Sequence, residues 1–95
     1  MDAVEKVFRF YESYRGEKQI IGRSVCGNPI AALFVGSGEP RILVQCAVHA
    51  REWVTALLAL EQIARGMPFG RAAFVPLSNP DGAALSLRGE GFLSE

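Results

Sequence analysis

The feature that most constrains the fold is an apolar strand that runs directly into a helix. Residues 41–48, RILVQCAV, are almost continuously apolar, which predicts a strand buried on both faces, as in the middle of a helix-covered sheet. A helix is predicted over residues 50–65, because its apolar positions recur at helical spacing and Gly66 and Pro68 follow it. A second apolar strand is predicted at residues 72–78, and a crossover of this length predicts that the two strands are parallel.

The remaining segments complete a small α/β pattern. Residues 2–14 carry one apolar stripe and one charged face, which predicts a surface helix. Residues 19–27 and 30–36 are β-rich runs separated by a turn, which predicts two adjacent antiparallel strands. The tail from residue 83 onward predicts one helical turn. The expected fold is therefore a helix-flanked mixed β-sheet of about four strands and two to three helices, forming one domain at most.

Composition and charge argue against several classes of function. Ten Lys and Arg residues balance ten Asp and Glu residues without clustering, which disfavours a nucleic-acid surface or a polybasic membrane patch. No apolar run approaches the roughly 20 residues that span a bilayer, and residues 1–18 are amphipathic rather than signal-like. We therefore expect no nucleic-acid partner, no membrane association and a cytoplasmic location. Cys26 and Cys46 are interpreted as reduced structural thiols.

The single histidine, His49, lies three residues before Glu52 at the predicted change from strand to helix. A helical projection places Glu52 in line with Ala56, Ala59 and Ile63, on an inward face where a carboxylate is costly unless it is neutralised. An imidazole and a carboxylate at this spacing could share a zinc ion with a third ligand and a water. The structural alternative is an acid that meets the helix dipole beside an ordinary strand-end histidine. Spacing alone leaves both interpretations open.

The surrounding sequence favours the metal. Residues 49–55, HAREWVT, resemble the zinc carboxypeptidase family typified by pancreatic carboxypeptidase A, in which H-A-R-E-W is a hallmark. Residues 20–38, IIGRSVCGNPIAALFVGSG, are similar to the family's G-x-S-x-x-G-x-x-I segment, and residues 74–87, FVPLSNPDGAALSL, resemble its P-x-x-N-P-D-G segment. Three motifs in the family's order are more specific than any one of them. One departure is Ala47, because the family often has glycine two residues before the histidine.

The resemblance implies roles for individual residues. His49 and Glu52 would be the first two of three ligands of one zinc ion, and Arg51 would line the substrate cleft, with an ordinary exposed helix-start arginine as its alternative. Asp81, in the turn sequence NPDG, would anchor backbone near the metal. The family's third ligand is a downstream histidine and its general base is a downstream glutamate. Neither can be matched here, so no catalytic residue is assigned.

These implications define the expected function. Residues 1–95 are expected to be the N-terminal portion of a single metallocarboxypeptidase-like catalytic domain, which hydrolyses C-terminal peptide bonds of peptide substrates, and to be inactive alone. The predicted sheet has an uncovered apolar edge, so we also expect an oligomer formed through that edge.

Three alternatives stay open. The first is a hydrolase of peptidoglycan-type peptides, and the second is a deacylase of the same fold, ranked lower because that branch lacks AREW. The third is a truncated, non-catalytic structural module. An inward Glu52 would argue against the third, because an idle buried carboxylate is costly to keep.

Overall fold

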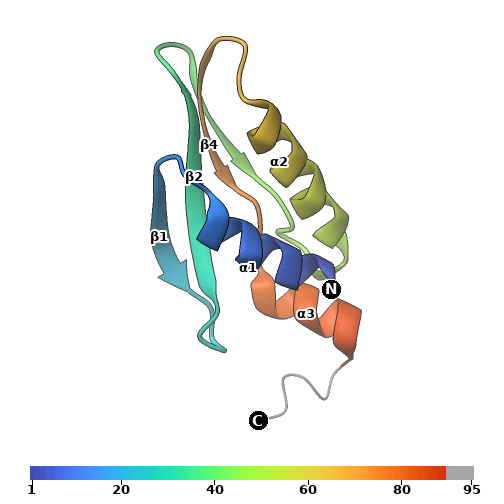
Figure 1. Cartoon of the computed structure of the whole chain (residues 1–95). Helices are drawn as coiled ribbons and strands as arrows, with labels where there is room; N and C mark the ends of the chain where they lie inside the picture. Colours follow the sequence, from blue (N-terminus) through green and yellow to red (C-terminus); the bar gives the residue numbers. More distant parts are fainter. Residues whose placement is uncertain (90–95) are drawn as a thin grey trace.

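The computed structural model describes residues 1–89 and contains four strands and three α-helices in that range (Figure 1). In chain order the elements are α1 (Ala3–Ser13), β1 (Lys18–Arg23), β2 (Pro29–Ser37), β3 (Arg41–Gln45), the 3-10 helix η1 (Ala50–Glu52), α2 (Trp53–Arg65), β4 (Gly70–Val75) and α3 (Pro80–Arg88). The predicted helix-flanked mixed α/β fold is thus confirmed. None of the helices in the described range combines the length and apolarity that crossing a membrane requires.

The four strands form one mixed sheet in the order β1-β2-β4-β3. The pairs β1–β2 and β2–β4 are antiparallel, whereas β3 and β4 are parallel and are joined through α2 (Figure 1). The parallel strand–helix–strand unit predicted from the sequence is confirmed. The two antiparallel strands predicted on either side of residues 24–28 are confirmed as well, although β1 ends at Arg23 rather than at residue 27.

The core lies between one face of the sheet and the helices α1 and α2. In the antiparallel register Leu33 pairs with Phe74 and Val35 pairs with Ala72, so these four side chains share a face. They pack in one cluster with the buried stripe of α1 and with three buried residues of α2: Val4, Val7, Tyr11, Ala56, Ala59 and Ile63. This cluster fixes α2 on the sheet, and therefore fixes the connection that leads into it.

The first helix is held at its start by two reciprocal side-chain bonds. The Asp2 carboxylate accepts a hydrogen bond from the Glu5 amide, and the Glu5 carboxylate accepts one from the Asp2 amide, each at 3.0 Å. Arg88, at the end of α3, donates to both carboxylate oxygens of Asp2 at 2.7 and 3.1 Å. The two ends of the described chain are therefore tied together, which sequence patterns did not indicate.

The predicted burial of the apolar strand was wrong within the described residues. The strand is shorter than predicted, Arg41–Gln45, and it lies at the edge of the sheet. Ile42 pairs with Ala72 on the core face and is 49% exposed, because only β4 flanks β3 among residues 1–89. Leu43 pairs with Ala73 on the opposite face, away from the core cluster, and is 63% exposed. A continuous run of apolar residues indicates that both faces of a strand are suited to burial. It does not indicate whether another strand lies beside it or whether both faces of the sheet are covered.

The C-terminal segment also differs from expectation. The sequence NPDG was predicted as a turn followed by one helical turn, whereas residues 80–88 form the helix α3. The Asn79 side-chain oxygen accepts a hydrogen bond from the Gly82 amide at 2.9 Å, and Pro80 occupies the first helical position, where its missing N–H is not needed. Turn-forming residues here start a helix. The rest of the predicted tail, residues 90–95, lies outside the described residues.

Candidate metal centre

The chain bends sharply after β3 because Ala47 adopts a φ of 53°. The bend is pinned to the end of β4 by three backbone bonds. The Cys46 amide donates to the Val75 carbonyl at 3.0 Å, the Ser78 amide to the Cys46 carbonyl at 3.0 Å, and the Asn79 amide to the Ala47 carbonyl at 3.1 Å. The segments that follow the two parallel strands therefore lie together at one edge of the sheet, and ligands commonly bind at such edges.

His49 and Glu52 lie in one tight turn at this edge. The Glu52 amide donates to the His49 carbonyl at 3.0 Å, closing the turn that begins η1. Both side chains are exposed. His49 occupies the cap position of η1 and Glu52 that of α2, yet neither side chain makes a capping hydrogen bond. The imidazole and the carboxylate are therefore not committed to starting either helix, which weakens the capping version of the structural alternative.

The expectation that Glu52 lies on the inward face of the helix was wrong. Ala56, Ala59 and Ile63 are buried as predicted, but Glu52 is exposed. Residues 50–52 form a 3-10 turn, so the rotation of about 100° per residue of an α-helix does not extend back from Trp53 to Glu52. The cost of a buried carboxylate consequently plays no part at this position.

The available donors fit zinc in chemistry but not in number. An imidazole nitrogen and a carboxylate oxygen are both common zinc ligands, and a catalytic site takes three protein ligands with an open position. Among residues 1–89 no three His, Cys, Asp or Glu residues gather closely enough to hold a metal ion. The described chain therefore offers two donors, and a third would have to come from elsewhere.

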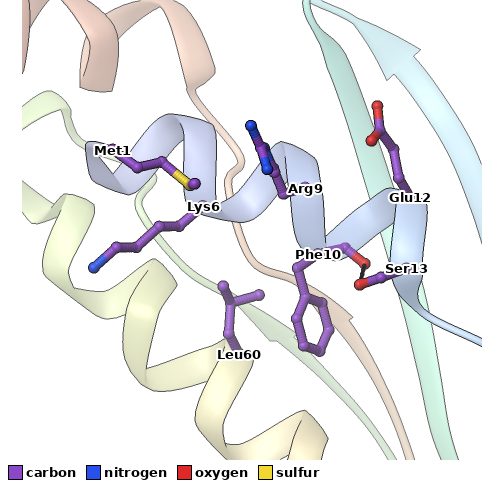
Figure 2. Close-up of a pocket in the computed structure, with 7 residues that line it drawn as sticks. All are labelled: Met1, Lys6, Arg9, Phe10, Glu12, Ser13 and Leu60. Carbon is purple, nitrogen blue, oxygen red and sulfur yellow. Dashed lines mark hydrogen bonds between the residues drawn. The ribbon is translucent and has the colours of Figure 1, made fainter.

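Arg51 borders a hollow beside this turn. Together with Ala50, Leu85 and Ser86 it lines a cavity of about 600 Å³ between η1 and α3. A guanidinium that opens on a cavity can bind a carboxylate through two parallel hydrogen bonds. A different hollow lies between α1 and α2 (Figure 2) and contains none of the predicted site residues; its lining is Met1, Lys6, Arg9, Phe10, Glu12, Ser13 and Leu60.

Asp81 anchors a neighbouring loop. Its carboxylate accepts hydrogen bonds from the Ser24 hydroxyl at 2.6 Å, the Asn28 side-chain amide at 2.9 Å and the Cys26 backbone amide at 3.0 Å. Burial raises the pKa of Asp81, but these hydrogen bonds together outweigh it and the pKa is lowered. Asp81 thus anchors the backbone of the turn between β1 and β2 through Cys26, whereas its expected place near a metal stays a prediction.

Thr55 is a residue of this site that sequence reasoning missed. Its hydroxyl donates to the Glu52 carbonyl and accepts from the Ala47 amide, both at 2.7 Å. It therefore joins the two ends of the segment that carries His49. The only sequence signal was its place as the last residue of the HAREWVT string.

Comparison with known proteins assigns the chain to a family. The sequence profile described as zinc carboxypeptidase matches residues 6–68, a span that includes His49, Arg51 and Glu52. The matched span covers two thirds of the chain and includes β3, α2 and the turn between them. The chain is a member of the zinc carboxypeptidase family.

Relatives show how much of a longer protein the chain corresponds to. It is 32% identical over 107 residues to gamma-D-glutamyl-L-diamino acid endopeptidase 1 of Lysinibacillus sphaericus, covering 94% of this chain and 26% of that protein. The chain therefore spans about a quarter of the length of this relative.

Two solved structures share the fold. Bovine thrombin-activatable fibrinolysis inhibitor, solved in complex with tick carboxypeptidase inhibitor, matches with a TM-score of 0.65 and 22% identity, over 90% of this chain and 31% of that one. Carboxypeptidase A from Helicoverpa armigera matches with a TM-score of 0.64 and 21% identity, over 90% and 24%.

The backbone at Ala47 gives a direct test of the bend. A positive φ is strained for a residue with a side chain and strongly disfavoured for a β-branched one. We predict that Ala47→Val lowers the free energy of unfolding by about 2–3 kcal/mol, whereas Ala47→Gly changes it by less than about 1 kcal/mol. Urea denaturation measures both. Ala73→Val, in extended strand β4, is the control and should cost less than Ala47→Val; equal costs would show that the bend is not the cause.

Proposed function

We propose that His49 and Glu52 are two protein ligands of one zinc ion in a peptidase site, and that Arg51 contacts the peptide substrate. One observation carries the proposal: a single closed turn at the carboxyl end of β3 presents an exposed imidazole and an exposed carboxylate that cap no helix. Membership of the zinc carboxypeptidase family supports the choice of metal.

The chemistry divides between the metal and the chain. A bound zinc ion would polarise a peptide carbonyl and acidify a water molecule. His49 and Glu52 would hold that ion at the edge of the sheet. Arg51 would orient a negatively charged group of the substrate at the cavity that it lines. Within residues 1–89 we assign no general base, so we propose that this chain alone does not hydrolyse peptides.

Two substrate classes are supported. Family membership supports hydrolysis of C-terminal peptide bonds. The relative with 32% identity is named gamma-D-glutamyl-L-diamino acid endopeptidase 1, and this name supports the peptidoglycan-type alternative as a second candidate. Because Glu52 is exposed, the cost of a buried carboxylate no longer counts against a non-catalytic module. Metal binding therefore has to be tested directly.

Zinc titration of the 95-residue chain tests the ligands. By calorimetry, the wild type should bind one zinc ion weakly, because a ligand shell with two protein donors is incomplete. His49→Ala and Glu52→Gln should each weaken binding by about tenfold or more. Glu61→Gln, which removes an exposed carboxylate farther along the same helix, should leave the affinity unchanged. Tight one-to-one binding by a verified monomer, or binding indifferent to both ligand substitutions, would contradict the proposal.

The substrate class needs a polypeptide in which this chain is joined to a segment that supplies a third ligand and a base. We predict that such a protein releases amino acids from peptides or cleaves gamma-D-glutamyl-diamino acid bonds, and that Arg51→Met raises KM more than it lowers kcat, because it removes a contact made to bound substrate. Liquid chromatography of both substrate types, with acyl-amino acids as a third, separates the candidates. Activity on acyl-amino acids alone would favour the deacylase instead.

We also propose that the chain self-associates through β3. Within residues 1–89, β3 is the last strand on its side of the sheet, and its edge carries the exposed side chains of Ile42 and Leu43. Sedimentation velocity should show a dimer or larger species, and Leu43→Lys should shift it toward monomer because a lysine at an edge opposes strand pairing. A wild-type chain that stays monomeric at high concentration would refute this.

A further inference from the structure

We infer that Thr55 is a positioning residue that holds the turn carrying His49 and Glu52 in its metal-binding conformation. The inference rests on the proposed zinc ligation for its consequence, but its first step is independent of metal. That step is the pair of hydrogen bonds that one hydroxyl makes to the backbone at Ala47 and at Glu52.

The chemistry of a hydroxyl fixes how this pair works. A threonine hydroxyl has one hydrogen to donate and lone pairs to accept with. The hydrogen goes to the Glu52 carbonyl, three residues earlier, a local bond that serine and threonine commonly make in helices. The lone pairs are then free for the Ala47 amide, which donates to them at 2.7 Å across eight residues of sequence.

The two bonds enclose the proposed ligands. Ala47 lies two residues before His49, and Glu52 is itself the second ligand, so a single oxygen atom fixes both ends of the segment 47–52. The Ala47 carbonyl is bound as well, by the Asn79 amide at 3.1 Å. The amide and the carbonyl of Ala47 are thus both hydrogen-bonded. A strained φ of 53° persists only where the surroundings hold the backbone in this way. If the bond from Thr55 is lost, the residue can relax toward negative φ and change the direction in which the chain presents His49.

A purely local role for Thr55 makes a different prediction. A threonine that only helps start α2 needs the bond to the Glu52 carbonyl and no bond to Ala47. Thr55→Val keeps the shape of the side chain and removes both bonds, whereas Thr55→Ser keeps the hydroxyl. Leu58→Ala, an exposed position on the same helix, is the control for a general change in α2.

The experiment measures amide hydrogen exchange by nuclear magnetic resonance in the metal-free chain, and then zinc titration of the same variants. Relative to reference amides in β2 and β4, exchange of the Ala47 amide should accelerate about tenfold in Thr55→Val and should stay within about twofold of wild type in Thr55→Ser and Leu58→Ala. Zinc affinity should fall about three- to tenfold in Thr55→Val and be restored by serine.

The outcomes separate this inference from the proposed function. Unchanged Ala47 exchange in Thr55→Val overturns the inference at its first step. Faster exchange with zinc affinity unchanged overturns it too, provided that His49→Ala still weakens zinc binding. If His49→Ala has no effect on zinc binding, the proposed ligation fails, and the exchange of Ala47 with rescue by serine then decides alone whether Thr55 fixes the turn.

Discussion

The site depends on the parallel pairing of β3 with β4. Because of this pairing, the chain leaves both strands at the same edge of the sheet. There, backbone hydrogen bonds from Cys46 to Val75 and from Asn79 to Ala47 connect the segments that follow the two strands. The core then fixes α2 against the sheet through Ala56, Ala59 and Ile63. Because the strand and the helix are both held, the six residues 47–52 between them have little freedom, and their conformation sets where His49 and Glu52 stand.

The same connection between β3 and α2 accounts for the alanine at position 47, where the sequence departs from the family's usual glycine. The family often has glycine at this position, and the structure shows a positive φ there, the region that glycine enters without steric cost. This chain adopts it with alanine, and relaxation is opposed by two hydrogen bonds, one donated by the Ala47 amide to the Thr55 hydroxyl and one donated by the Asn79 amide to the Ala47 carbonyl. Such strain is tolerated where the surroundings over-determine the backbone, which is common at functional sites.

Sequence patterns predicted the fold class and the position of His49 and Glu52 at the change from strand to helix, but not the details of that connection. The strand–helix–strand unit followed from apolar runs and helix-ending residues, because hydrophobic periodicity reflects local geometry. The exposure of Leu43 could not be predicted, since it depends on what covers the face of the sheet opposite the core. The prediction that Glu52 faces inward was wrong because residues 50–52 form a 3-10 turn, so the angular spacing of an α-helix does not apply to Glu52. Thr55 escaped notice because its partner Ala47 is close in space only after the chain bends, and apolar periodicity carries no information about side-chain-to-backbone bonds.

The proposed zinc ion is bound by His49 and Glu52 together. Crystals of the chain soaked in zinc, with diffraction collected on both sides of the zinc absorption edge, test this shared binding most directly. We expect one anomalous peak about 2.0–2.2 Å from an imidazole nitrogen of His49 and from a carboxylate oxygen of Glu52. A peak bound to other residues, or side chains of His49 and Glu52 that stay apart with zinc bound elsewhere, would contradict it.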